Sequence, residues 1–186
     1  MLSQAFLLST GIVSLAEIGD KTQLLALLLA TRFKKPVPII LGIFTATVLN
    51  HFGAAWLGQF ASSYINMDVL KWLLGASFIA MALWMLIPDQ LDDDTRLLDK
   101  LGVFGATCVA FFLAEMGDKT QIATVALSAR YHDTVSVVLG TTLGMMVANV
   151  PAVLLGEVAA RKLPTELVHR VAAGLFVVVG VLTFLA

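Results

Sequence analysis

A nine-residue segment occurs twice in this chain, and each copy lies inside a long apolar run. Residues 15–23 read LAEIGDKTQ and residues 113–121 read LAEMGDKTQ, so the copies differ at one position and are 98 residues apart. The same offset relates further pairs along the chain: Arg32 with Arg130, Gly42 with Gly140, and Gly58 with Gly156. Self-similarity at a fixed offset indicates that the chain consists of two related halves.

The apolar runs are long enough to be membrane helices. Hydrophobic residues make up 59% of the chain and charged residues 13%, and the mean hydropathy of +0.90 is far from that of an ordinary soluble domain. A helix needs about 20 mostly apolar residues to cross a bilayer. The runs are continuous and show no alternation, which favours helices over strands. We therefore predict an all-α membrane protein with six transmembrane helices, over residues 4–30, 37–60, 69–87, 101–128, 135–158 and 167–186.

Three predicted helices fall in each half, and this odd number fixes how the halves are related. After three crossings, the second half must enter the membrane with the opposite orientation from the first. We therefore expect two inverted-topology three-helix repeats, over residues 1–88 and 101–186, joined by an acidic cytoplasmic connection at residues 89–100. In such folds, equivalent residues of the two halves meet near the middle of the bilayer.

Basic residues are divided unequally between the two sides of this predicted fold. One side carries only Lys71 and Arg130. The other carries eight cations: Arg32, Lys34, Lys35, Arg96, Lys100, Arg161, Lys162 and Arg170. Since cytoplasmic loops are enriched in Lys and Arg, we expect the eight-cation side to be cytoplasmic and both termini to lie outside. The N-terminal apolar run lacks the positive flank of a cleaved signal, and we interpret it as the first membrane helix.

Both copies of the repeated segment place ionisable residues in the middle of a predicted membrane helix. Asp20 lies three residues and Lys21 four residues after Glu17, so on a continuous helix both would share a face with Glu17. Residues 115–119 repeat this pattern. Ionisable groups at this depth are costly unless they are paired or hydrated, and they usually mark a functional pathway. The glycine between the acids would allow the helix to loosen and free carbonyl oxygens for a ligand.

The side chains of the two motifs point to a hard divalent cation. Carboxylate, amide and hydroxyl oxygens suit Mg²⁺, Ca²⁺ or Mn²⁺, and we interpret the mid-membrane His51 as a packing or hydrogen-bonding residue. Four carboxylates and two ammonium groups leave a charge that one divalent cation would balance. The predicted ligands are Glu17, Asp20, Glu115 and Asp118, with Asn50 and Asn149 as further ligands or as interhelical hydrogen-bonding residues. The predicted supporting residues are Lys21, Thr22, Gln23, Lys119, Thr120 and Gln121.

Other interpretations of these residues are weaker. Glu17 with Lys21, and Glu115 with Lys119, would serve as structural ion pairs, but this pairing would leave the two motif aspartates without partners. An enzyme is not expected, because no serine or histidine accompanies the acids at catalytic spacing. The formal net charge of -1 gives no indication of nucleic-acid binding, and the single cysteine, Cys108, excludes an intrachain disulfide framework.

The hexapeptides EIGDKT and EMGDKT resemble the doubled E-x-G-D-K-[TS] motif of the Gdt-type cation/proton antiporters. This family includes Golgi proteins implicated in manganese and calcium homeostasis and bacterial manganese exporters. The resemblance covers essentially the whole chain, including the acidic segment between the halves. It implies an antiporter of the bacterial plasma (inner) membrane that exchanges Mn²⁺, Ca²⁺ or both for protons. We predict that the protein exports Mn²⁺ from the cytoplasm, that the buried glutamates carry the protons, and that no cofactor is bound. A Ca²⁺/H⁺ antiporter with the same site, an exporter of small cationic metabolites, and a non-transporting membrane scaffold or assembly factor are the alternatives.

Overall fold

The computed structural model describes residues 3–84, 101–155 and 165–185, and these ranges are almost entirely helical. The first half contains α1 (Gln4–Glu17), α2 (Lys21–Phe33), α3 (Pro36–Tyr64) and α4 (Met67–Trp84). The second half contains α5 (Gly102–Glu115), α6 (Lys119–Tyr131), α7 (Thr134–Leu155) and α9 (Thr165–Leu185). The described residues include no strand, so the predicted all-α fold is confirmed for them. The predicted acidic connection, residues 89–100, lies outside the described residues.

Two of the six predicted helices are each divided into two shorter ones. The first, predicted over residues 4–30, is α1 followed by α2, and the fourth, predicted over residues 101–128, is α5 followed by α6. With 14 residues each, α1 and α5 are about 21 Å long at 1.5 Å per residue, which is shorter than the hydrocarbon core. The prediction of continuous helices at these two places is therefore wrong. Within the described ranges, α3 and α7 are long and apolar enough to cross a membrane alone.

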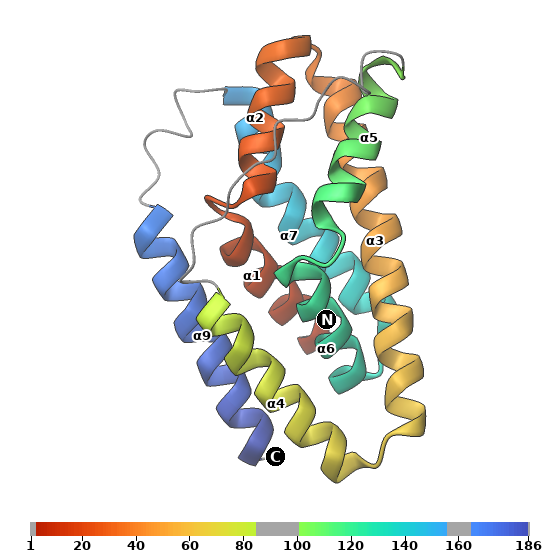
Figure 1. The fold of residues 1–186 in the computed structure, drawn as a ribbon, viewed down its shortest axis with the longest axis vertical. Helices are drawn as coiled ribbons and strands as arrows, with labels where there is room; N and C mark the ends of the chain where they lie inside the picture. The colour runs from red at the N-terminus through yellow and green to blue at the C-terminus, as the bar shows by residue number, and fades with distance from the viewer. Residues whose placement is uncertain (1–2, 85–100, 156–164, 186) are drawn as a thin grey trace.

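Helices that the repeat relates run in opposite directions (Figure 1). In this view the chain rises through α1 and α2, whereas it descends through α5 and α6. It descends along α3 but rises along α7, and it rises along α4 but descends along α9. The second half therefore has the same order of helices as the first half, with each helix running in the opposite direction.

Each half packs mainly against the other half. Contacts between halves join α1 to α7, α3 to α5 and α6, and α4 to α9. A Cβ atom added at Gly42 would lie 2.7 Å from the Cβ of Thr107, and one added at Gly140 would lie 2.9 Å from the Cβ of Ser9. Since Ser9 and Thr107 also correspond in the repeat, the same close approach occurs twice with the halves exchanged. The 98-residue offset thus relates contacts as well as sequence.

The protein buries polar side chains and exposes large apolar ones. On α3, the imidazole of His51 is fully buried, whereas Phe52 is 57% exposed and Trp56 58% exposed. The ionisable motif residues Glu17 and Glu115 are also fully buried. A soluble domain has the opposite distribution. Buried ionisable groups beneath an apolar exterior are the arrangement of an integral membrane protein, whose outer surface contacts lipid tails.

Candidate metal centre

The first motif forms a tight turn between α1 and α2. Ile18 has φ −67° and ψ 116°, Gly19 has φ +84°, and the N–H of Asp20 donates to the carbonyl oxygen of Glu17 at 3.1 Å. These angles and this hydrogen bond define a type II β-turn, whose third residue requires a positive φ and therefore favours glycine. The glycine of the motif thus breaks the helix completely, where the sequence led us to expect only a loosening.

The second motif forms the same turn between α5 and α6. Met116 has φ −65° and ψ 117°, Gly117 has φ +76°, and the N–H of Asp118 donates to the carbonyl oxygen of Glu115 at 3.1 Å. In both copies the glutamate therefore ends one helix and the aspartate precedes the next. The prediction that glutamate, aspartate and lysine share one face of a helix is wrong, because the turn separates them.

A glutamine four residues after each motif glycine closes the turn. The side-chain oxygen of Gln23 accepts a hydrogen bond from the Gly19 N–H at 2.8 Å, and that of Gln121 accepts one from the Gly117 N–H at 2.7 Å. These backbone groups would otherwise lack an intrahelical partner. Gln23 and Gln121, predicted as supporting residues, thus engage their oxygens with backbone and hold the geometry of the break.

Three carboxylates from the two motifs converge. Glu17, Glu115 and Asp118 each offer one oxygen, these oxygens lie within 4.8 Å of one another, and all three residues are buried. One comes from the first turn and two come from the second. Hard divalent cations bind oxygens at about 2.0–2.6 Å, so a single ion placed between these oxygens can contact all three. The fourth predicted carboxylate, Asp20, is not part of this group.

The lysines pair across the two motifs. Lys119 donates a hydrogen bond to the carboxylate of Asp20, and the side chains of both residues are essentially inaccessible. The ammonium of Lys21 lies 2.8 Å from Oδ1 of Asp118. Both motif aspartates therefore have a lysine partner from the other half. Each turn places its aspartate within reach of the lysine of the other half.

Each motif threonine contacts the glutamate of its own motif. The hydroxyl of Thr22 donates to Oε2 of Glu17, and the hydroxyl of Thr120 donates to Oε2 of Glu115 at 3.0 Å. The second carboxylate oxygen, Oε1, is buried in both glutamates and has no hydrogen-bond donor within the described ranges. A buried oxygen without a partner is costly, and a bound cation or proton would satisfy it.

The two predicted asparagine ligands differ in their contacts. The amide of Asn50 donates to the Phe112 carbonyl at 3.0 Å and its oxygen accepts from Gln121 at 3.4 Å, so this side chain links helices. Asn149 donates to the Met145 carbonyl at 3.0 Å, but in the part of the chain that the structure describes its buried side-chain oxygen has no hydrogen-bond donor. The contacts of Asn50 favour the hydrogen-bonding interpretation, whereas Asn149 retains a free ligand atom.

Sequence analysis missed the position of one residue, His51. Its Nε2 lies 4.0 Å from Oε2 of Glu115, and both residues are fully buried. The sequence favours His51 as a packing or hydrogen-bonding residue, and the structure adds that it borders the carboxylate group at Glu115. A signal was present in the repeat, because the 98-residue offset pairs His51 with Asn149 and both are polar residues inside an apolar run.

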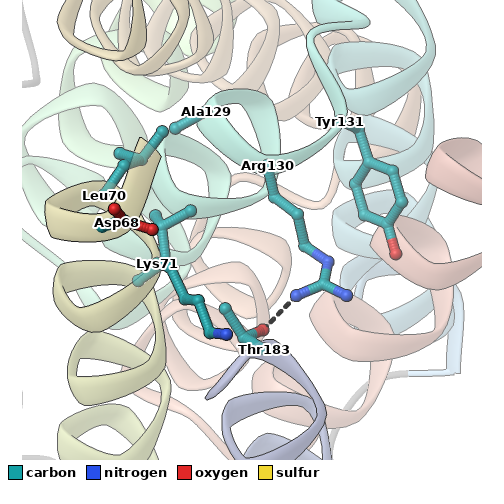
Figure 2. Close-up of a pocket in the computed structure, with 8 residues that line it drawn as sticks. Asp68, Leu70, Lys71, Ala129, Arg130, Tyr131 and Thr183 are labelled. Atoms are coloured by element: carbon teal, nitrogen blue, oxygen red, sulfur yellow. Dashed lines mark hydrogen bonds between the residues drawn. The ribbon is translucent and has the colours of Figure 1, made fainter. Parts of the chain in front are cut away.

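A separate cavity of about 460 Å³ lies among α4, α6 and α9 (Figure 2). Lys71 and Arg130 line it together with Asp68 and Tyr131, and the guanidinium of Arg130 donates a hydrogen bond to Thr183. None of the motif carboxylates lines this cavity. Lys71 and Arg130, the two cations that the sequence assigns to the same side of the membrane, both line this cavity.

Comparison with known proteins identifies the relatives of this chain. A Vibrio cholerae protein named "Putative manganese exporter" is 54% identical over 177 residues, which cover 95% of this chain and 88% of that protein. GDT1-like protein 3 of Oryza sativa is 28% identical over 202 residues, covering 94% of this chain and 71% of the rice protein. A GDT1-like protein of Synechocystis is 27% identical over 202 residues, covering 97% and 96% of the two chains. No solved structure matches.

A family model extends this relationship along nearly the whole sequence. The model described as divalent cation/proton antiporter GDT1 matches residues 5–93 and 103–186. The two matched segments correspond to the two halves and together include both turns. The resemblance inferred from the repeated motif is thus confirmed, and this chain belongs to the GDT1 family of divalent cation/proton antiporters.

Proposed function

We propose that this protein exports Mn²⁺ from the cytoplasm in exchange for H⁺. The observation that carries the proposal is the group of three buried carboxylates, Glu17, Glu115 and Asp118, which both halves of the repeat contribute. Membership of a family of divalent cation/proton antiporters supports the reaction class, and the name of the Vibrio cholerae relative favours manganese as the cation. Metal ions and protons are the substrates, and no resident cofactor is required.

The charges of the site suit one divalent ion. The Asp20–Lys119 and Lys21–Asp118 pairs are each neutral in sum, which leaves the negative charges of Glu17 and Glu115. One Mn²⁺ balances these two charges, and so do two protons. The glutamates therefore bind either the metal or protons, and this mutual exclusion couples the two fluxes in opposite directions.

Lys21 has a further role in this scheme. Its ammonium lies beside Asp118, which is also one of the three converging carboxylates. A metal that binds Asp118 competes with Lys21 for the same carboxylate. The lysine thus limits how tightly the metal is held, which favours release on the far side of the membrane.

The two halves provide the access pathway. We infer six membrane crossings, in which α1 with α2 and α5 with α6 each cross as a broken pair, arranged as two inverted repeats over residues 1–88 and 101–186. The opposite directions of corresponding helices support this (Figure 1). Rocking of one half against the other would expose the carboxylates first to one side and then to the other.

The orientation follows from the cations. Lys71 and Arg130, which line one cavity, lie near the start of α4 and near the end of α6. These two helix ends are in the lower part of Figure 1, whereas Arg32 lies in the last turn of α2, which ends at the top of that view. By the enrichment of basic residues in the cytoplasm, the end with Arg32 faces the cytoplasm of a bacterial plasma membrane. Both termini then lie outside.

The test is Mn²⁺ flux in proteoliposomes that contain purified protein and an internal pH reporter. We expect Mn²⁺ movement to drive proton movement in the opposite direction, and Glu17→Gln or Glu115→Gln to abolish both fluxes. Asp68→Asn is the matched control, because this acid is exposed and lies away from the motifs, and it should retain full flux. Normal flux in both glutamate variants would disprove the site. Flux that is indifferent to an imposed pH gradient would disprove proton exchange.

A further inference from the structure

His51 lies beside the carboxylate group in an unusual state for a buried histidine. Its side chain is fully buried, and neither Nδ1 nor Nε2 has a hydrogen-bond partner among the described residues. Its Nε2 lies 4.0 Å from Oε2 of Glu115, one of the three converging carboxylates. Buried polar side chains are normally satisfied, and an exception at a polar site points to a missing ion or water.

The second half provides a matching residue. Asn149 occupies the position of His51 in the repeat, 98 residues later, and it is also fully buried. No described residue donates a hydrogen bond to its side-chain oxygen. Each half therefore buries one unpartnered acceptor at an equivalent position, a nitrogen in the first half and an oxygen in the second half.

We infer that the imidazole of His51 is a ligand of the transported metal and shifts the selectivity of the site from Ca²⁺ and Mg²⁺ toward transition-metal ions. The inference rests on the proposed function, because it adds a specificity-determining residue to the same site. His51 is not one of the three converging groups, so its nitrogen would join the ligands of an ion held by Glu17, Glu115 and Asp118 from the side of Glu115. A neutral imidazole leaves the charge balance of the site unchanged.

The selectivity follows from ligand chemistry. Ca²⁺ and Mg²⁺ strongly prefer oxygen ligands and gain little from an imidazole nitrogen. First-row transition ions bind nitrogen more strongly, and their affinity for a mixed nitrogen and oxygen site rises from Mn²⁺ to Co²⁺. A site of carboxylates alone would discriminate poorly between Mn²⁺ and Ca²⁺. One imidazole nitrogen lets the site discriminate between Mn²⁺ and Ca²⁺. It does so without creating the thiolate or multiple-histidine site that would retain Zn²⁺.

Direct evidence would come from pulsed electron paramagnetic resonance of Mn²⁺ bound to the full-length protein in detergent. A coordinated imidazole should give nitrogen modulation of the Mn²⁺ echo. Labelling the wild-type protein with ¹⁵N-histidine should change this modulation, and this test needs no substitution in the site. The matched control is His132→Asn, since His132 is exposed beyond the end of α6 and its loss should leave the modulation unchanged. A modulation that does not respond to ¹⁵N-histidine would overturn the inference.

The selectivity is tested with His51→Asn, which gives the first half the residue of the second half. Because loss of even an indirect metal contact lowers affinity by about 10–100-fold, we expect the ratio of Mn²⁺ to Ca²⁺ flux in proteoliposomes to fall on the order of tenfold. The ratio of Co²⁺ to Ca²⁺ flux should fall further than the ratio of Mn²⁺ to Ca²⁺ flux. An unchanged ratio in a variant that still transports would overturn the inference.

Failure of the proposed function gives a different result. If the wild-type protein moves neither Mn²⁺ nor Ca²⁺, the transport proposal is wrong, whereas the ¹⁵N experiment still reports whether His51 binds Mn²⁺. If His51→Asn does not fold, Asn149→His supplies the second test, because it adds a nitrogen at the equivalent position. It should raise the ratio of Mn²⁺ to Ca²⁺ flux, and a lowered ratio would contradict the assignment.

Discussion

The two motif turns have the same backbone geometry but different surroundings. Each is a type II turn with a glycine at positive φ, and in each a threonine hydroxyl donates to the preceding glutamate. Their lysines differ, however. The side chain of Lys119 is 1% exposed, whereas that of Lys21 is 22% exposed. The Asp20–Lys119 pair is therefore sealed in the protein, and the Lys21–Asp118 pair is partly open.

This difference separates what the motif sequence determines from what the packing around it determines. Turn type, glutamine closure and the threonine contact are local, so both copies have them. Exposure of each lysine and the nature of the nearby acceptor, His51 or Asn149, depend on the helices of the other half. Near-identical motifs thus contribute unequally to one site. In a transporter whose halves rock against each other, we expect these unequal environments to exchange between the two states.

Removal of the lysines tests this inequality and should have the largest effect. Lys119→Met removes the buried ammonium that donates to Asp20, and loss of one member of a buried ion pair typically costs about 3–5 kcal/mol. Lys21→Met should cost clearly less, since water can reach its pair. The free energy of unfolding, measured by SDS titration of the protein in mixed micelles, gives both values. Equal losses would show that the two pairs contribute equally and that the difference in exposure has no energetic meaning.

The sequence predicts the motifs and the apolar helices, but it does not show that two of these helices are broken at the motifs. Hydropathy averages over a window of residues, so a four-residue turn at residues 17–20 does not interrupt an apolar run. The turn depends on one backbone angle, the positive φ of Gly19, and on closure by Gln23. A glycine between the two acids of each motif was the available signal, and it predicted a loosened helix where the structure has a complete break.

The partners of the motif side chains were harder to predict than the motif residues themselves. The four-residue spacing predicts that Glu17 and Lys21 are neighbours on one helix face. In the structure, however, Lys21 contacts Asp118 in the other half. Such contacts depend on how two halves dock, which one sequence does not encode in its local pattern. His51 shows the same limit, since its approach to Glu115 joins α3 to the end of α5.

Substitution of the turn glycine tests whether the break is a backbone requirement, with an intermediate effect. A Cβ at Gly117 would meet no atom within 4 Å, so Gly117→Ala isolates the cost of an alanine at φ +76°, about 1–2 kcal/mol. The matched control is Gly53→Ala in α3, where a Cβ also meets nothing. Because Gly53 is inside a helix, Gly53→Ala should instead raise the free energy of unfolding by up to about 1 kcal/mol. The same SDS titration measures both, and a stabilising Gly117→Ala would show that the turn does not need its glycine.

The smallest expected effect concerns how the two halves begin their long helices. α3 starts with Pro36 after Lys35, which makes no side-chain cap hydrogen bond. At the corresponding position before α7, Asp133 accepts a hydrogen bond from the Ser136 N–H at 3.0 Å. Hydrogen bonds from the side chain and backbone of Ser136 hold the pKa of Asp133 below its ordinary value of 3.8.

Asp133→Ala should therefore cost about 1 kcal/mol through loss of this cap, whereas Lys35→Ala should cost almost nothing. The sign of the pH dependence follows from the lowered pKa of Asp133. A carboxylate whose pKa is lower in the folded state stabilises that state at pH values above 3.8 and loses this contribution as the pH falls below it. The difference in unfolding free energy between wild type and Asp133→Ala should thus be full at pH 7 and shrink below pH 3.8. A difference that stays constant on acidification would show that the charged carboxylate is not the stabilising group, and that the two helix starts differ only by proline.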